Sequence, residues 1–271
     1  MIKHLQNLHI HTCYCDGKDT PEEIVLAAIE KGFSSIGFSG HAYMSYSKFF
    51  QKNGDHTEQY KKEIRRLKEK YKDRLKIYCG LEIDMYSDTD QSGYDYLIGA
   101  VHYLECEDGY VTFDNSAEEL KMFVNRYFGS GMEFAKAYYR TLAELPQHGK
   151  FDILAHFDLI TKHGDNLQLF DTSAKEYRNA AIEAAEALAG KIPLFEVNTG
   201  AISRGYRRTP YPSVEIIKEF KRLGFGAVIT SDCHDRKYLD CGFREAAELL
   251  KECGYKEKYI FTEQGFVAVP L

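Results

Sequence analysis

The chain has 271 residues, a formal net charge of -6, 44% hydrophobic and 28% charged residues. The negative charge argues against nucleic acid or an anionic membrane as the main partner, and no apolar run approaches the roughly 18 residues that a membrane helix needs. Seven cysteines without a C-x-x-C pair are typical of reduced thiols. With no signal-peptide core at the N-terminus, these features predict a cytoplasmic enzyme-sized protein.

The first predicted element is a strand over residues 5–10, which runs into the pair His9 and His11. Because side chains alternate between the two faces of a strand, both imidazoles would point the same way at its end. Turn residues follow, and then Thr20 and Pro21 supply an N-cap and a proline at the first position of a helix. This stretch therefore predicts a strand, a turn that presents two histidines, and a helix.

The rest of the chain repeats this alternation. Apolar runs predict six more strands, at 35–39, 75–83, 96–102, 151–156, 193–198 and 226–232. Helical spacing is present at 56–72, 116–147 with a break near Gly129, 173–189, 213–223 and 243–253. A small hairpin is expected within 103–115 and an aromatic, polar loop over 43–55. Apolar strands that alternate with helices predict a parallel sheet of βα units, and no linker-like tract divides it.

Metal-binding residue types lie at or just past the predicted strand ends. In a βα barrel these C-terminal ends form the active-site face. Any one of these residues has an ordinary explanation as a cap, a salt-bridge partner or a buried histidine, but the whole series needs one common cause. The residues are His9, His11, His41, Glu82, His102, His156, Asn198, Asp232 and His234.

Imidazole nitrogens and carboxylate oxygens suit Zn, Mn or Fe. The set is too large for one tetrahedral site, so it predicts two or three divalent ions, with the two oxygens of Glu82 as a bridge. Adjacent ions would lower the pKa of a bridging water and neutralise phosphoryl oxygens. The pattern therefore favours a metal-dependent phosphoesterase.

At these positions the sequence resembles the PHP (polymerase and histidinol phosphatase) superfamily and, within it, the histidinol-phosphate phosphatase branch. The branch rests on the chain length, on residues 156–160, and on Asn198-Thr199 with arginines and a Pro-Tyr-Pro-Ser segment downstream. The stretches that match the superfamily, in family order, are 8–12, 16–17, 37–41, 80–82, 99–102, 153–158, 196–199 and 231–234.

The resemblance implies an α/β fold, a distorted (β/α)7 TIM-like barrel with the metal site at the C-terminal ends of the strands, as one PHP-type metallophosphoesterase domain over residues 1–271. It also implies three groups of metal ligands, which are His9, His11, Glu82 and Asp232; Glu82, His102 and His156; and Asp16, His41 and His234. Some family members have a histidine at the position of Asp16, in the third group.

The implied activity is hydrolysis of L-histidinol phosphate to L-histidinol and phosphate, a step of histidine biosynthesis, through attack of a metal-bridging hydroxide. The expected catalytic residues are Glu82, His41 and Asp16, and the general acid stays open among His41, Asp16 and a metal-bound water. The partner is a small phosphorylated substrate, and the oligomeric state is not predicted. The expected phosphate contacts are Arg204, then Lys162, and after them Arg207 and Arg208.

Other activities make different demands on the same residues. A PHP-type enzyme could instead act on another small phosphomonoester or on a phosphodiester or nucleotide. An amidohydrolase commonly needs a bridging carbamylated lysine or a single-metal set, and no lysine lies at a predicted strand end. A nuclease would want an extended basic channel, and a metal-binding regulatory module would bind metal without cleaving phosphate esters.

Overall fold

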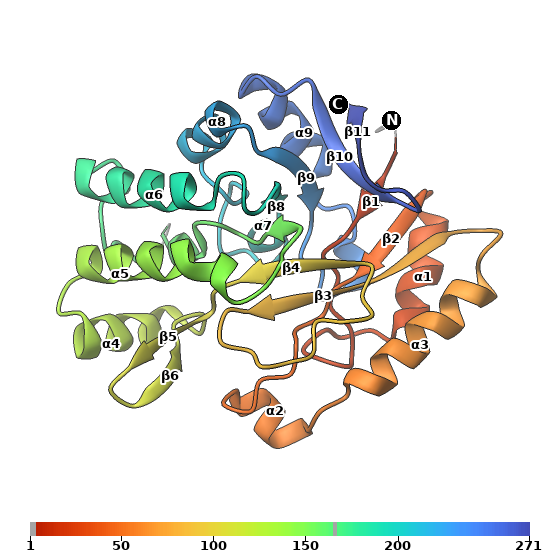
Figure 1. The fold of residues 1–271 in the computed structure, drawn as a ribbon, viewed down its shortest axis with the longest axis horizontal. Helices are drawn as coiled ribbons and strands as arrows, with labels where there is room; N and C mark the ends of the chain where they lie inside the picture. The colour runs from red at the N-terminus through yellow and green to blue at the C-terminus, as the bar shows by residue number, and fades with distance from the viewer. Residues whose placement is uncertain (1–3, 165–166) are drawn as a thin grey trace.

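The computed structural model describes residues 4–164 and 167–271, and a sheet of seven parallel strands lies at its centre (Figure 1). Each strand lies within or overlaps one of the seven predicted strands. The predicted order of strands along the chain is therefore confirmed. In sheet order the strands are β1 (Gln6–Asn7), β2 (Ser35–Phe38), β3 (Lys76–Asp84), β4 (Tyr96–Ala100), β7 (Ile153–Leu154), β8 (Leu194–Asn198) and β9 (Gly226–Thr230).

The two edges of this sheet meet just beyond β1 and β9. The backbone N–H of His11 donates to the carbonyl of Cys233 at 2.9 Å, and the N–H of Cys233 donates to the carbonyl of His9 at 3.0 Å. Ile10 and Cys233 form a parallel bridge. These bonds nearly close the sheet, so the expected seven-stranded barrel is confirmed.

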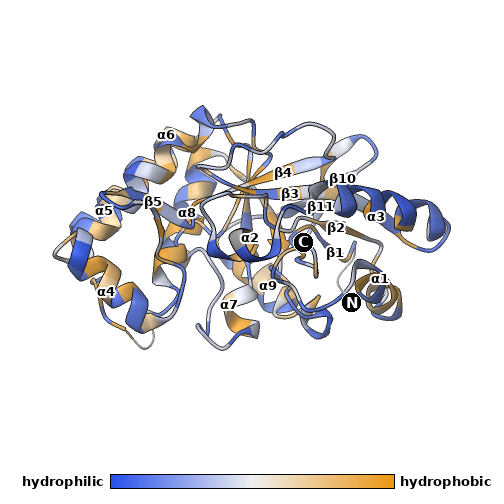
Figure 2. Cartoon of the chain, turned by 90° about the horizontal axis from the view of Figure 1, so that it is seen from below, coloured by the Kyte–Doolittle hydropathy of each residue, from blue (hydrophilic) through white to orange (hydrophobic). Residues whose placement is uncertain are grey.

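Helices cover the outside of the barrel (Figure 1). In α1, the predicted N-cap Thr20 also forms a capping box with Glu23, and the predicted break near Gly129 separates α4 from α5. Hydrophobic and hydrophilic residues alternate in patches along α4 and α5, whereas α3 is mostly hydrophilic (Figure 2). The helices are α1 (Pro21–Glu30), α3 (Thr57–Lys70), α4 (Ala117–Tyr127), α5 (Gly131–Glu144), α6 (Lys175–Leu188), α8 (Val214–Leu223) and α9 (Phe243–Glu252).

Some connections carry more structure than predicted. The expectation of a loop over 43–55 was wrong in part, because α2 (Lys48–Asn53) forms there and buries Phe50 against Tyr43 with ring centroids 5.4 Å apart. The small hairpin expected within 103–115 is confirmed. The hairpin strands are β5 (Tyr103–Cys106) and β6 (Gly109–Thr112), and the short helical turns are η1 (Leu145–Gln147), η2 (Leu159–Thr161), α7 (Gly200–Ser203) and η3 (Arg236–Tyr238).

A C-terminal hairpin, β10 (Glu257–Thr262) and β11 (Gly265–Pro270), covers the end of the barrel at which the strands begin. The side-chain amide of Gln6, in β1, donates to the carbonyl of Phe261 at 2.8 Å, and the N–H of Phe261 donates back to Gln6 Oε1 at 2.7 Å. The Phe261 ring also packs on Tyr78 and Tyr96, the latter being the first residue of β4. The apolar end of the barrel is therefore filled, and the polar chemistry lies at the other end.

Tyr96 fills the barrel interior next to two glycines. A Cβ at Gly80 would lie 2.3 Å from Cζ of Tyr96, and a Cβ at Gly37 would lie 2.3 Å from its hydroxyl oxygen. Both positions must lack a side chain for the ring to fit. In the described part of the chain, no helix is both long and apolar enough to cross a membrane.

Lys258, in β10 of the C-terminal hairpin, makes the stability of the fold depend on pH. It is 3% exposed, and burial lowers the pKa of its ammonium to about 8. Below pH 8 the folded chain bears the cost of a buried charge. Between pH 8 and about 10.4 the unfolded chain still binds the proton that the folded chain has released, so stability rises with pH.

We expect Lys258→Met to raise the free energy of unfolding at pH 7 by roughly 1–3 kcal/mol, and the gain to shrink as the pH approaches 10. Urea unfolding at several pH values measures this. Lys256→Met, at an exposed position two residues away, is the matched control and should change little. Equal stability of Lys258→Met and the parent chain at pH 7 would contradict the prediction.

Candidate metal centre

Polar side chains gather at the C-terminal ends of the strands, and on β4 and β9 they continue the period-two series of interior positions. On β4, Ile98 and Ala100 belong to the apolar cluster inside the barrel, and His102 follows two residues later. On β9, Val228 belongs to the same cluster, and Asp232 lies four residues further on. On β4 and β9 the interior face thus changes from apolar side chains to metal-binding ones at the same end of the barrel. After β1 and β7 the alternation is broken, because His9 and His156 directly follow Leu8 and Ala155 of the same cluster.

Glu82, near the end of β3, lies in the middle of these side chains and is 1% exposed. Its Oε2 lies 2.9 Å from His41 Nδ1, 3.3 Å from His9 Nε2 and 3.5 Å from His11 Nε2. Asp232 Oδ1 completes this side, at 3.2 Å from His11 Nε2 and 3.7 Å from His9 Nε2. The structure therefore brings together all members of the first predicted group.

The other oxygen of Glu82 faces the second predicted group. Oε1 lies 3.0 Å from His156 Nε2 and 3.5 Å from His102 Nε2. The two histidine nitrogens are themselves 3.2 Å apart. Two imidazole lone pairs at that distance repel each other unless a proton or a cation lies between them.

The third predicted group lies at the more exposed edge of the cluster, where the Asp16 side chain is 42% exposed. Asp16 Oδ2 lies 3.2 Å from His234 Nε2 and 3.6 Å from His41 Nε2. Its Oδ1 lies 3.2 Å from His11 Nδ1. His11 therefore adjoins this group, and His41, which is a member of it, also contacts Glu82.

The residues fit a metal ion on two observations. Buried His9 Nε2, His11 Nε2 and Glu82 Oε2 have no hydrogen-bond partner, a state that costs about 1–3 kcal/mol per group when nothing satisfies it. Nitrogen and oxygen ligands placed ~2.0–2.1 Å from a tetrahedral zinc ion would be roughly 3.3 Å apart, close to the 3.2–3.7 Å that separates these atoms and Asp232 Oδ1. The histidine and carboxylate cluster is thus able to bind metal.

Burial and charge act in opposite directions on the ionisable groups of the cluster. Burial alone would lower the pKa of His9, but the carboxylates of Glu196, Glu82 and Asp232 raise it to about 10. Burial alone would raise the pKa of Glu82, and the neighbouring histidines hold it well below its usual range. In the absence of metal, a proton on His9 therefore offsets part of the carboxylate charge.

Two of the predicted phosphate contacts face the same cavity as the metal-binding residues. Arg204 Nη2 donates to Asp232 Oδ2 at 2.9 Å, and Lys162 Nζ donates to Asp114 Oδ1 at 2.9 Å. Both cations therefore lie beside the cluster. The cavity has a volume of about 240 Å³ and is lined by Asp16, His41, Glu82, His102, Asp114, His156, Leu159, Lys162, Arg204, Tyr206, Asp232 and His234.

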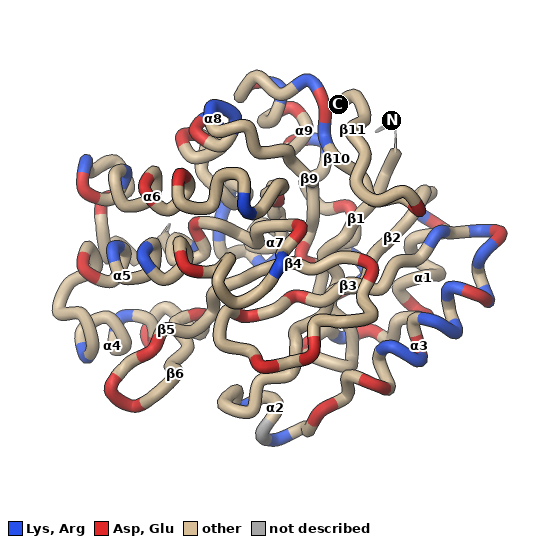
Figure 3. The backbone as a smooth tube through the Cα atoms, viewed as in Figure 1, with Lys and Arg blue, Asp and Glu red and all other residues tan. Residues whose placement is uncertain are grey.

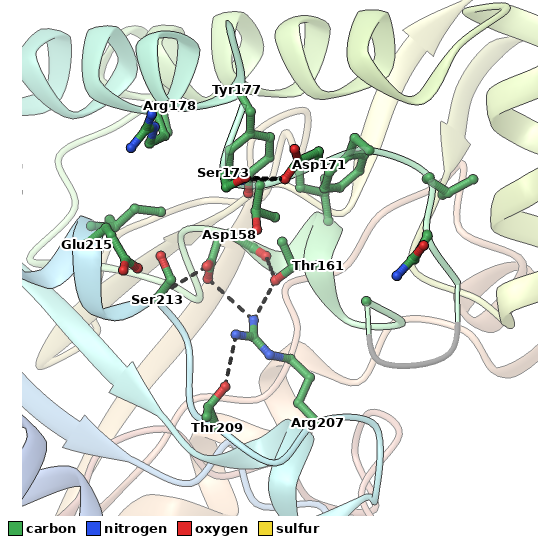
Figure 4. A pocket seen from close by; sticks show the side chains of 18 of the residues that line it. Asp158, Thr161, Asp171, Ser173, Tyr177, Arg178, Arg207, Thr209, Ser213 and Glu215 are labelled. Carbon is green, nitrogen blue, oxygen red and sulfur yellow. Dashed lines mark hydrogen bonds and ion pairs between the residues drawn. The ribbon is translucent and has the colours of Figure 1, made fainter. Parts of the chain in front are cut away.

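Arg207, also predicted to bind phosphate, lies in a different and larger cavity of about 790 Å³ (Figure 4). Its guanidinium donates to Thr161 Oγ1, lies 3.7 Å from Asp158 Oδ1, and stacks 4.5 Å from the centre of the Tyr211 ring. The cavity at the metal cluster is not lined by Arg207, and Arg208 is exposed. The roles of the four cations stay predictions.

Sequence reasoning gave no role to three buried or cavity-facing carboxylates. Glu196 is 0% exposed and accepts from His9, and Asp84 is 2% exposed and accepts from the backbone N–H of His102. Asp114 faces the cavity after the β5–β6 hairpin. Glu196 and Asp84 share the alternating face of Asn198 and Glu82 on their strands, and this spacing was the signal that could have found them.

Comparison with known proteins gives one family. A model of the PHP domain matches residues 7–200. The probable histidinol-phosphatase of Deinococcus radiodurans is 26% identical over 260 residues, covering 91% of this chain and 92% of that protein. The histidinol-phosphatase of Bacillus subtilis is 27% identical over 270 residues, covering 90% and 98%.

The fold is also similar to a solved structure. The crystal structure of the histidinol phosphate phosphatase of Lactococcus lactis, in complex with zinc, L-histidinol and phosphate, superposes with a TM-score of 0.71 at 22% identity. The superposition covers 97% of this chain and 99% of that protein. The barrel and its order of elements are therefore common to both proteins.

Exchange of Glu82 for glutamine tests the cluster. Glu82→Gln replaces one oxygen by an amide NH2 that faces histidine nitrogens, so we expect metal per chain to fall by about half or more and the affinity for zinc to fall about 10–100-fold. Elemental analysis and zinc titration measure this. Glu105→Gln, at an exposed position on β5, is the matched control, and unchanged metal content in Glu82→Gln would argue against the cluster as the metal site.

The raised pKa of His9 predicts proton release on metal binding. At pH 7, below the pKa of about 10, His9 holds a proton that must leave before the ring can bind a metal ion. Zinc titration of the metal-free protein should therefore release about one proton or more per chain, and zinc affinity should rise with pH. Calorimetry in buffers of different ionisation enthalpy measures it, and buffer-independent enthalpies would refute the prediction.

Proposed function

The chain belongs to the PHP domain family, and on this premise we propose that it is a metal-dependent phosphomonoesterase that hydrolyses L-histidinol phosphate to L-histidinol and phosphate. The reaction forms a bond between a water oxygen and phosphorus and breaks the bond from phosphorus to the alcohol oxygen. The observation that carries the proposal is the set of unpartnered buried nitrogen and oxygen atoms around Glu82. The histidinol-phosphatases that resemble this chain over most of both lengths support the substrate.

We propose two or three divalent ions of Zn, Mn or Fe at the cluster, in keeping with the nitrogen and oxygen donor set and with the zinc in the Lactococcus lactis structure. His9, His11, Glu82 and Asp232 would hold one ion and His102 and His156, with Glu82, a second. Asp16, His41 and His234 would hold a third. Bound there, divalent ions would lower the pKa of water and neutralise charge on phosphoryl oxygens.

The cations beside the cluster would bind the phosphate group. Arg204 is held by Asp232, and Lys162 is held by Asp114 and lies 4.8 Å from the centre of the Tyr206 ring. These contacts fix both head groups at the cavity before substrate arrives, which lowers the entropy cost of binding an anion. We assign phosphate binding first to Arg204 and then to Lys162.

Protonation of the leaving alcohol falls to residues at the open edge of the cluster. The side chains of Asp16 and His41 are 42% and 21% exposed, whereas that of Glu82 is 1% exposed. A proton donor must come within hydrogen-bond reach of the leaving oxygen. Asp16, His41 and a water on the ion that they would hold are therefore the candidates for this role, and Glu82 is the residue that orders the histidines.

A small ester suits the site better than a nucleic acid does. The cavity of about 240 Å³ is lined by a few convergent polar groups, as is typical of small-molecule sites. A protein that binds along a nucleic-acid strand would favour a continuous track of basic residues. On the outer helices α3, α5 and α6, by contrast, acidic and basic residues are interspersed (Figure 3). We infer that the whole chain, residues 1–271, acts as a single PHP-type metallophosphoesterase domain.

Phosphate release from a panel of esters tests the proposal. We expect histidinol phosphate to be hydrolysed with a kcat/KM at least about 10-fold above other small phosphomonoesters and far above a phosphodiester. Metal content is measured on the same sample, and activity should be lost on chelation and restored by zinc or manganese. Activity on a diester without activity on histidinol phosphate would overturn the substrate, and bound metal without any esterase activity would favour a regulatory module.

A further inference from the structure

The geometry points to Glu196 as a positioning residue that decides which nitrogen of His9 faces the metal cluster. The inference rests on the proposed metal sites but not on the proposed substrate. It assigns a role to a carboxylate that lies inside the barrel, on β8, two residues before the strand end at Asn198. Its basis is the set of four hydrogen bonds that this carboxylate accepts.

Glu196 is 0% exposed, and each of its oxygens accepts two hydrogen bonds. Oε2 accepts from His9 Nδ1 at 2.9 Å and from Thr230 Oγ1 at 2.8 Å. Oε1 accepts from the backbone N–H of His156 at 2.8 Å and from Asn198 Nδ2 at 2.7 Å. His9 lies two residues after β1, His156 lies two residues after β7, Thr230 ends β9 and Asn198 ends β8, so one carboxylate joins four parts of the barrel.

This pattern makes Glu196 a partner of the metal-binding residues and not a ligand itself. A carboxylate has about four lone-pair directions, and all four are used here. Glu82 differs, because its Oε2 is buried without any hydrogen-bond partner. The free acceptor at the centre of the cluster thus belongs to Glu82, while Glu196 is fully engaged with the surrounding protein.

The hydrogen bond to Glu196 fixes the tautomer of His9. A carboxylate only accepts, so His9 Nδ1 must carry the proton that it shares with Glu196. The lone pair of the neutral ring then lies on Nε2. That atom has no hydrogen-bond partner and lies 3.3 Å from Glu82 Oε2 and 3.7 Å from Asp232 Oδ1. Glu196 therefore directs the metal-binding lone pair of His9 into the cluster.

The same carboxylate also positions the second group. By accepting from the backbone N–H of His156, two residues after β7, Glu196 fixes the backbone from which the His156 side chain points toward Glu82. One residue thus orients a histidine of each of the two groups that share Glu82. Partners of this kind typically change metal affinity 10–100-fold when they are removed.

Exchange of Glu196 for glutamine makes a specific prediction about the proton of His9. The amide NH2 must take the place of one oxygen. At the Oε1 position it would face the backbone N–H of His156, which cannot accept, whereas at the Oε2 position it faces His9 Nδ1 and the rotatable hydroxyl of Thr230. The NH2 therefore takes the Oε2 position, His9 Nδ1 becomes an acceptor, and the proton of neutral His9 moves to Nε2.

Zinc alone is the probe for the test. In zinc-loaded parent protein labelled with 15N-histidine, we expect His9 to carry its proton on Nδ1 and zinc on Nε2. In Glu196→Gln we expect zinc affinity to fall about 10–100-fold, with at least one fewer tightly bound ion and loss of the His9 Nδ1 proton signal. Thr230→Val is the matched control, because it removes a hydrogen bond to the same oxygen and leaves the donor–acceptor pair of His9 unchanged. Its zinc affinity should fall far less.

The outcomes separate this role from a merely structural one. Zinc bound to His9 Nδ1 in the parent protein would overturn the inference, and this measurement holds even where Glu196→Gln does not fold. Folded Glu196→Gln with parental zinc affinity, or an equal loss in Thr230→Val, would also overturn it. Because no substrate is used, failure of histidinol phosphate hydrolysis leaves this result unaffected.

Discussion

The ion-pair network of Glu82 is the constraint on which the rest of the structure depends. A carboxylate buried at 1% exposure is costly unless opposite charges or hydrogen bonds surround it, and here five imidazoles lie within 3.5 Å of its oxygens. The imidazoles come from four places along the chain: His9 and His11 follow β1, His41 follows β2, His102 follows β4 and His156 follows β7. The strands must therefore reach their ends in the same layer, and this requirement sets the register of the barrel.

The barrel divides this charged layer from an apolar one. Tyr96 and the aromatic residues of the C-terminal hairpin fill the end where the strands begin, while the period-two positions further along the same strands carry the polar groups. Since Gly37 and Gly80 leave room for the Tyr96 ring, the lower layer is closely packed. A closely packed apolar layer of this kind holds the metal-binding side chains at the C-terminal ends of the strands more firmly than loops would.

Much of the architecture was predictable because its signals are local. An apolar run such as 96–101 followed by His102 predicts a strand, its burial and the metal-binding residue at its end from one short segment. Glu196 was harder to assign because its partner His9 lies 187 positions away, and a carboxylate within an apolar strand does not reveal which donors will face it. The position of Arg207 was likewise hidden, since its partner Asp158 and its cavity arise only when distant segments pack.

Closure of the barrel between β1 and β9 also determines the order of events during synthesis. His9 and His11 leave the ribosome early, whereas Asp232, their partner at 3.7 and 3.2 Å, comes more than 200 residues later, after all seven strands of the sheet. A nascent chain thus carries exposed histidines without the carboxylate that completes their group. Tight metal loading therefore has to wait for the last βα unit, and a chain that stops before it would hold an incomplete site.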